Sequence, residues 1–449
     1  MITITTVELL QKSIDYIEEN LKTDITITEI AQHAGFSVYH FCRLFSNYIG
    51  MPVAAYMTKR RLYHGIYDIQ AGKKTIDVAL EYGFNTYPGF YKAFKREFGC
   101  SPTRYLDLNT VSKPVPIDLS KEAKFMLNKR QITQLLSKWD VEKELEINDV
   151  FTAGGAIKSN NAWSIGDKYI FKTGKNISGL KTHIAISRAL EKAGMKSPTP
   201  IKTKTGEDFI IQDDRYYILT NRIEGQFLSP DERYSHNRES IGEKYGEAIG
   251  SLHKILKKQD KSIEVNDNNL LKTVLDWALP KTRVTMEQWA CPLPDEFYEN
   301  YINNFPKIYD NSPRHIIHRD ANPSNIIFNE GQVSGFLEFE ISERNVRIFD
   351  PCYCATGILS EAGEIEAGYE KWPDILRGII RGYDKAVNLS NWEKEAIPYV
   401  IYSIQMIFIA WLLDNESYKG LAIRNREMLL WIWENRDKCF ERIFKDQKS

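Results

Sequence analysis

The chain has 449 residues, of which 43% are hydrophobic and 27% charged, and its formal net charge is −1. It is therefore too long for a single helical module, fits two or three domains, and has the composition of an ordinary soluble protein with a large core. The first residues lack a basic region followed by an apolar core, so no signal peptide is expected. The most apolar run, 399–413, is too short to cross a bilayer, and no membrane partner is predicted.

Two similar helix-turn-helix patterns follow one another between residues 24 and 106. Small and aromatic residues of the first pattern recur 48 or 49 positions later in the second: Ala31, Gly35, Phe36, Phe41, Phe45, Gly50 and Tyr56 become Ala79, Gly83, Phe84, Phe90, Phe94, Gly99 and Tyr105. Composition alone does not produce such a register. We therefore infer an internal duplication of one helical unit.

Each copy carries the signals of a short helix, a stop and a second helix. In the first copy Thr26 and Glu29 form a capping box, Gly35 ends the helix, and Ser37 caps the next one. The corresponding residues of the second copy are Gly83, Thr86 and Pro88. The second helices carry apolar stripes at helical spacing: Phe41, Leu44, Phe45 and Tyr48, then Phe90, Ala93, Phe94 and Phe98. The opposite faces stay free for the major groove of DNA.

Residues 8–106 resemble the AraC/XylS-type transcription regulators, through "ITEIAQHAGFS" and through the order Gly83-Phe84, Phe90, Ala93-Phe94-Lys95 and Ser101-Pro102. The resemblance implies seven helices, with a long helix at about 52–69 that holds two recognition helices one groove turn apart, and double-stranded DNA as the partner. The predicted DNA-binding residues are Ser37, Tyr39, His40, Cys42, Arg43, Thr86, Tyr87, Pro88, Tyr91 and Lys92. Pro88 and Gly89 depart from the family, where polar residues are more usual. The alternative is a compact bundle with a solvated face, which would not need the duplication.

A linker is predicted at 108–118, where periodicity is lost and two prolines stand one residue apart. A helix at 119–139 precedes strand hairpins around Gly154-Gly155, Gly166-Asp167 and Asp213-Asp214, with a helix before Gly194 between the last two. This order is that of a kinase-like small lobe.

Asp320, Asn325 and Glu338 lie on a predicted strand-loop-strand segment, and their oxygen atoms suit Mg²⁺ with a nucleotide. The segments "HRDANPSN", "GFLEFE" and "IFDPCYCA" resemble the aminoglycoside phosphotransferase and choline kinase superfamily over about residues 120–440. The resemblance implies that Asp320 accepts a hydroxyl proton, Asn325 and Glu338 hold the metal, Lys172 binds phosphate, and residues 221–224 form the adenine hinge. ATP and Mg²⁺ are the implied cofactors.

Three departures from that family bear on activity. Glu338 replaces the usual metal-binding Asp, and His183 stands where a helix Glu usually pairs with the lysine, so it cannot neutralise Lys172. The loop 153–161 lacks the glycine spacing of protein kinases. Asp350 is expected to cap its helix, and His318 to brace the loop. Cys352 and Cys354 form a lone C-x-C, which we interpret as buried or free thiols of a reducing cytoplasm rather than a zinc site.

The predicted fold class is multidomain: an all-α double helix-turn-helix module at 1–107, then an α+β kinase-like bilobal domain at 119–449 with its small lobe at about 119–225. The sequence favours a cytoplasmic, sequence-specific transcription regulator whose kinase-like domain senses a small molecule or nucleotide. The alternative is an active phosphotransferase, for an aminoglycoside or choline-like hydroxyl acceptor, with an attached DNA-binding domain. A homodimer is compatible with both.

Overall fold

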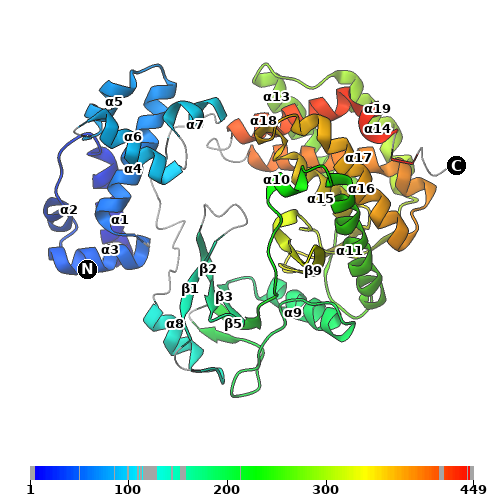
Figure 1. The fold of residues 1–449 in the computed structure, drawn as a ribbon, viewed down its shortest axis with the longest axis horizontal. Helices are drawn as coiled ribbons and strands as arrows, with labels where there is room; N and C mark the ends of the chain where they lie inside the picture. Colours follow the sequence, from blue (N-terminus) through cyan, green and yellow to red (C-terminus); the bar gives the residue numbers. More distant parts are fainter. Residues whose placement is uncertain are drawn as a thin grey trace. The chain divides into compact units, whose positions relative to one another are not determined.

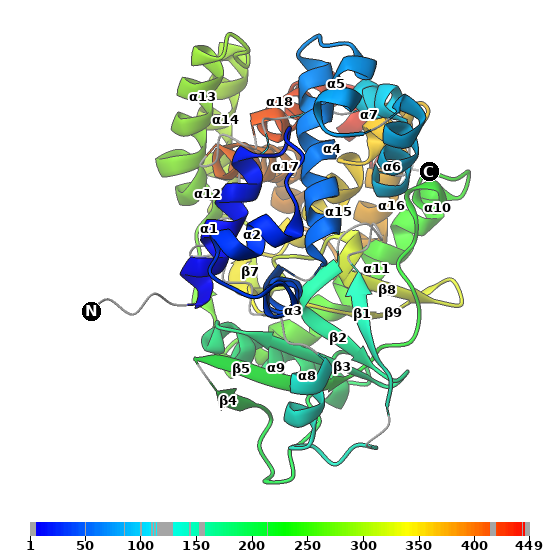
Figure 2. The same cartoon turned by 90° about the vertical axis from the view of Figure 1, so that its left-hand side faces the viewer.

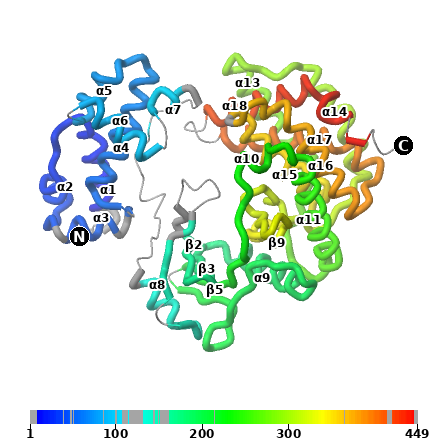
Figure 3. Tube along the Cα trace, viewed as in Figure 1, coloured from blue at the N-terminus to red at the C-terminus, as the bar shows by residue number. Residues whose placement is uncertain are grey.

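The computed structural model describes residues 6–49, 51–84, 86–98, 101–108, 111, 114, 129–142, 145–151, 158–212, 214–413, 419–441 and 443–444. The chain divides into two compact units, residues 1–136 with 415–420, and residues 137–414 with 421–449 (Figure 1). Most of the predicted linker 108–118 and the first part, 119–128, of the helix predicted at 119–139 lie outside the described residues, which are the coloured parts of the tube in Figure 3. The second part of that predicted helix contains a helix at Lys129–Leu136.

The first unit is helical throughout its described part. Its helices are α1 Thr6–Glu19, α2 Ile27–His33, α3 Val38–Ile49, α4 Val53–Gln70, α5 Thr75–Glu81, α6 Tyr87–Phe98, α7 Pro102–Leu108 and α8 Lys129–Leu136. The predicted capping box of Thr26 and Glu29 is present at the start of α2. Gly35 and Gly83 have φ values of 75° and 74°, which confirms them as left-handed helix stops.

The long helix α4 contributes to two hydrophobic clusters, one for each copy of the repeat. Its first half packs with Phe41 and Phe45 of α3, and its second half packs with Phe90 and Phe94 of α6. All four phenylalanines are fully buried, as the apolar stripes predict. The duplicated sequence thus forms two similar helical units that share one central helix.

The second unit begins with an antiparallel sheet of order β1-β2-β3-β5-β4. Its strands are β1 Ile147–Phe151, β2 Lys158–Ile165, β3 Tyr169–Gly174, β4 Ile210–Gln212 and β5 Arg215–Asn221. Helix α9 Ile177–Lys192 lies beside this sheet in both views (Figures 1 and 2), where Leu180 and Ile184 pack on Tyr216 and Ile218. The predicted hairpin around Gly166-Asp167 is confirmed by the pairing of β2 with β3, and the hairpin predicted around Asp213-Asp214 by the pairing of β4 with β5. Gly154-Gly155 lies outside the described residues.

The remainder of the second unit is mostly helical. Its helices are α10 Pro230–Arg233, α11 Arg238–Gln259, α12 Leu270–Thr273, η1 Val274–Ala278, α13 Leu279–Gln288, α14 Asp295–Tyr309, η2 Pro323–Asn325, α15 Phe349–Leu359, η3 Ala362–Glu364, α16 Gly368–Val387, α17 Asn391–Leu412, α18 Lys419–Glu434 and α19 Arg436–Phe440. Its short strands are β6 Asn266–Asp267, β7 Arg314–Ile317, β8 Ile326–Asn329, β9 Gln332–Phe336 and β10 Glu343–Val346.

Helices α11 and α16 lie side by side and meet through glycines (Figure 1). A methyl group at Gly242 or Gly246 would collide with the backbone of α16, and one at Gly378 or Gly382 would collide with the backbone of α11. Only glycine allows two helix backbones to approach this closely. We call this contact the glycine seam.

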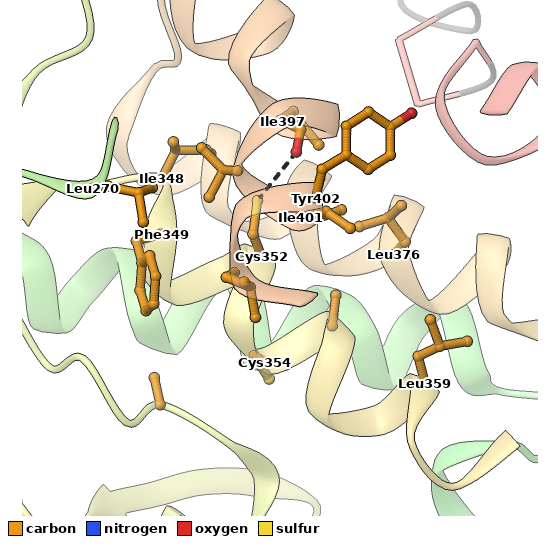
Figure 4. Close-up of a cluster of buried hydrophobic side chains, with 14 of the residues drawn as sticks. Leu270, Ile348, Phe349, Cys352, Cys354, Leu359, Leu376, Ile397, Ile401 and Tyr402 are labelled. Atoms are coloured by element: carbon orange, nitrogen blue, oxygen red, sulfur yellow. Dashed lines mark hydrogen bonds between the residues drawn. The ribbon is translucent and has the colours of Figure 1, made fainter. Parts of the chain in front are cut away.

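The core of the large lobe contains Cys352 and Cys354, both fully buried (Figure 4). Burial raises the pKa of both thiols, which keeps them protonated. Helix α17 is 22 residues long, so the apolar run at 399–413 belongs to a helix that is, by length and composition alone, able to cross a membrane. Within the described residues 67% of its most apolar window is buried inside the protein, as in a core helix.

Candidate functional site

Asp320 lies in the loop between β7 and β8, and its carboxylate accepts hydrogen bonds from three side chains. Asn325 Nδ2 donates to Asp320 Oδ2 at 2.8 Å, and Asn322 Nδ2 and Tyr353 Oη donate to Oδ1 at 2.8 Å and 3.0 Å. The carboxylate is therefore fixed in orientation, as a proton-accepting group must be. The motif predicted that Asp320 and Asn325 belong to one site in different roles, whereas it gave no sign of Tyr353, which comes from α15.

Buried side chains brace this loop from behind. Asp350 accepts hydrogen bonds from the backbone N–H groups of His318 at 2.7 Å and Arg319 at 2.9 Å, and it pairs with His253 Nε2 at 2.8 Å. The prediction that Asp350 caps its own helix was wrong, because its oxygens are used by the loop and α15 has no side-chain cap. His318 braces the loop as predicted: Nε2 donates to Leu337 O at 2.7 Å, and Nδ1 accepts from Asp320 N at 3.2 Å.

Lys172, on the central strand β3, is paired with two carboxylates. Its ammonium contacts Glu338 directly and lies 2.7 Å from Glu340 Oε1. Burial alone would lower the pKa of Lys172, but the attraction of Glu340 and Glu338 outweighs burial and raises it, so the lysine stays charged. Burial, countered by Lys172, also raises the pKa of Glu338, whereas the pull of Lys172 exceeds burial at Glu340 and lowers its pKa.

Glu340 was missed by sequence reasoning. His183 occupies the helix position of the usual glutamate, and its Nδ1 accepts the Phe339 N–H at 3.2 Å. Burial and the nearby Lys172 lower the pKa of His183 to about 4, so the ring is neutral at physiological pH. The acids that pair with Lys172 therefore come from the segment of Glu338 and Glu340, not from the helix.

A cavity of about 350 Å³ is lined by Lys172, His183, Glu338 and Glu340, whereas Asp320 and Asn325 are not among its described lining residues. The predicted hinge residues Asn221, Arg222 and Ile223 line it together with Lys172 and Glu338. In the described part of the chain no cluster of three His, Cys, Asp or Glu side chains could hold a metal ion. The chemistry of a nucleotide with a divalent cation nevertheless suits this cavity, because Glu338 offers carboxylate oxygens there and the phosphates would supply further ligands.

Backbone strain marks the same two segments. Arg319, just before Asp320, has φ 74°, and Glu338 has φ 59°, both in the left-handed region that residues with side chains rarely adopt. Leu337 N donates to Asn325 O at 2.9 Å, so the two strained segments are joined by hydrogen bonds. Strained residues of this kind cluster where ligands bind. The glycine-poor loop at 153–161 lies largely outside the described residues.

The outer faces of α3 and α6 are solvent-exposed within the first unit. Ser37, His40 and Arg43 are exposed and Cys42 is half-buried, while the side chain of Tyr39 lies outside the described part. The second helix exposes Thr86, Tyr87, Pro88 and Lys92 and half-buries Tyr91. Ser37 and Thr86 accept backbone N–H groups as helix caps. Among described residues neither Arg43 nor Lys92 forms an ion pair, which leaves both cations available for DNA.

Fold and site together define a two-part protein, in which a double helix-turn-helix module precedes a kinase-like phosphotransferase fold. The sequence model of the helix-turn-helix domain family matches residues 30–107 of this chain. The sequence model of the phosphotransferase enzyme family matches residues 166–394. The chain therefore belongs to the phosphotransferase enzyme family and carries an AraC-type helix-turn-helix DNA-binding domain.

Known proteins resemble the two parts separately. The transcriptional activator AarP of Providencia stuartii is 36% identical over 91 residues, which are 67% of that protein but 20% of this chain. An amicoumacin kinase structure covers 70% of this chain and 96% of its own at 12% identity, with a TM-score of 0.51. A microcompartment-associated aminopropanol kinase covers 70% of this chain and 100% of its own at 13% identity, with a TM-score of 0.52. These likenesses confirm the kinase-like fold.

Proposed function

We propose that this protein regulates transcription in the cytoplasm by binding a specific DNA sequence through α3 and α6, and that its kinase-like domain senses a small molecule or nucleotide. The ion pair between Lys172 and Glu338 carries the sensing half of the proposal. Glu338, which we assign to the metal, is held by Lys172, which we assign to the phosphates. A nucleotide must therefore exchange this ion pair for its own contacts, and such an exchange is a structural change that a regulator can use.

A second candidate function is phosphotransfer to a hydroxyl acceptor. The observation that favours it is the fixed Asp320 carboxylate, together with a lysine that Glu340 keeps neutralised. In this role Asp320 would take the acceptor proton, Lys172 would hold phosphate oxygens, and Asn325 with Glu338 would hold Mg²⁺. The ion would supply charge neutralisation at the phosphates. The amicoumacin kinase structure, which contains AMP-PNP and Ca²⁺, supports a nucleotide with a divalent cation in this cavity.

ATP turnover separates the two functions. The full-length protein is incubated with ATP, Mg²⁺ and a panel of aminoglycosides, choline and small sugars, alongside Asp320→Asn and Glu338→Asp. We expect no transfer by the wild type, measurable Mg-ATP binding, and activity created by Glu338→Asp, because the shorter carboxylate restores the usual metal ligand. Turnover by the wild type that Asp320→Asn abolishes would establish the enzyme instead. Absence of both nucleotide and DNA binding would refute the proposal.

A further inference from the structure

A second cavity, of about 460 Å³, lies in the large lobe, and Asp320 itself is not among its described lining residues. Two of its lining residues, Asn322 and Tyr353, are the same residues that donate hydrogen bonds to Asp320 Oδ1. A ligand in this cavity would therefore lie next to the carboxylate that we assign to an acceptor hydroxyl. The volume is typical of sites for drug-sized molecules and far exceeds what choline needs.

Gln405 of α17 lines this cavity and is 2% exposed. Its Oε1 atom is buried and has no hydrogen-bond partner among the described residues. A buried amide oxygen without a partner destabilises the folded state, because the hydrogen bond to water is lost and not replaced. This oxygen is closed off from the cavity in the ligand-free protein, so the N–H or O–H donor of a ligand would satisfy it once the Gln405 side chain turns into the cavity.

The other walls of the cavity are apolar, neutral polar or electrically balanced, and the neutral polar residues include Thr356, Ser360 and Asn425. Phe408, Trp411 and Met428 form part of the apolar wall. Arg233 and Glu361 are the charged residues among the described lining residues, and they form an ion pair with each other. The described walls thus offer no unpaired carboxylate to the several ammonium groups of an aminoglycoside.

We infer that this cavity binds an uncharged, largely apolar alcohol with a second hydrogen-bond donor. Its hydroxyl would lie next to Asp320, its second donor would bind Gln405 Oε1, and its apolar body would contact α17 and α18. The inference rests on the proposed function, because it names the ligand class of the kinase-like domain. Choline fits poorly, since its hydroxyl is its only donor, and a polycation fits poorly for want of acids.

Titration calorimetry on the full-length protein tests the ligand class with three probes. Chloramphenicol is a neutral aryl alcohol with an amide N–H, choline is a small cation, and kanamycin is a polycation. We expect chloramphenicol to bind most tightly and Gln405→Met to weaken it about tenfold, because one hydrogen bond is lost. The matched control is Ser187→Ala on α9, which removes another buried oxygen without a partner among the described residues, outside this cavity. It should leave binding unchanged.

Thermal unfolding without ligand gives a second measurement. Gln405→Met should raise the Tm by about 2 °C, since it removes a buried unsatisfied oxygen. A lower Tm would overturn the inference, because Gln405 would then have a structural partner. Tighter binding of kanamycin, or chloramphenicol binding insensitive to Gln405→Met, would overturn the ligand class yet leave a ligand-binding domain. Failure of all three probes and of Mg-ATP to bind would count against the proposed function itself.

Discussion

Two glutamates, Glu338 and Glu340, pair with Lys172 in the cavity that we propose for a nucleotide. Glu340 neutralises the lysine from within the cavity, while the side chain of Glu338 is 46% exposed and also pairs with the lysine. As long as Glu340 remains, Lys172 keeps a partner when Glu338 leaves. The departure at His183 therefore does not leave the lysine unpaired.

Glu340→Gln should lower Mg-nucleotide affinity by about tenfold, because Lys172 would then depend on Glu338 alone and withhold it from the cation. Titration calorimetry with ATP analogue and Mg²⁺ measures the effect. Glu299→Gln, at an exposed position on α14, is the matched control and should change nothing. Equal affinities for wild type and Glu340→Gln would show that Glu340 has no part in the site.

Glu18 governs the acid stability of the DNA-binding unit. Arg60 donates to its two oxygens at 2.5 Å and 2.8 Å, and Tyr56 donates at 3.0 Å. Burial alone would raise the pKa of Glu18, but hydrogen bonds from His64 and Arg60 prevail and lower it below its ordinary value of 4.5. Its stabilising contribution is therefore complete above about pH 4.5 and is lost as pH falls through the lower folded-state value.

Glu18→Gln should lower the free energy of unfolding of the first unit by about 2 to 3 kcal/mol at neutral pH, because Arg60 loses its carboxylate partner in a largely buried site. The variant should also lose part of the acid dependence. Hydrogen exchange of α1 and α4 at neutral pH measures the first effect, and exchange from about pH 4.5 downward measures the second. An unchanged exchange profile would contradict the assigned role of this ion pair.

The residues that sequence reasoning found and missed differ in where their partners lie. Asp320 and Asn325 are five positions apart and make contact within one loop, so a motif predicts them together. Lys172 and Glu340 are 168 positions apart, and their pairing depends on how the two lobes fold. A signal was present nevertheless, because Glu340 is a second acidic residue only two positions after Glu338.

At the level of elements, the duplicated helices were the most predictable part of the fold. Capping residues and apolar stripes act locally, so their effect can be worked out from neighbouring residues. Asp350 behaved differently, because its carboxylate binds a loop some thirty positions earlier rather than the start of its own helix. Local helix rules do not include such tertiary competition for a side chain.

The two recognition helices should contribute differently to DNA binding. Arg43→Ala should lower affinity for a selected site about tenfold and relax its sequence preference, because arginine can bind a guanine edge with two donors. Lys92→Ala should weaken binding to all sequences and reduce the salt dependence by about one counterion. Fluorescence anisotropy over a salt series measures both, with exposed Lys12→Ala on α1 as control. Unchanged affinity in both variants would argue against DNA contact through these faces.

At the level of the whole molecule, sensing requires that the two units influence one another's binding. If Mg-ATP changes DNA affinity by some factor, DNA must change Mg-ATP affinity by the same factor, typically about 5- to 150-fold. Paired titrations, each with and without the other partner, measure the two factors. Two factors of one would leave the sensing proposal without support, and Lys172→Met should abolish any coupling that is seen.

The glycine seam separates what may vary from what may not. A methyl group added at a seam glycine would collide with the backbone of α11 or α16, so these glycines cannot be replaced. Phe408, Trp411 and Met428 instead line an open cavity, where side chains of other sizes fit. Related proteins can therefore change their ligand preference through substitutions of these cavity residues while the glycines of the seam stay the same. Libraries randomised at those three positions should remain folded, and libraries randomised at Gly246 should not.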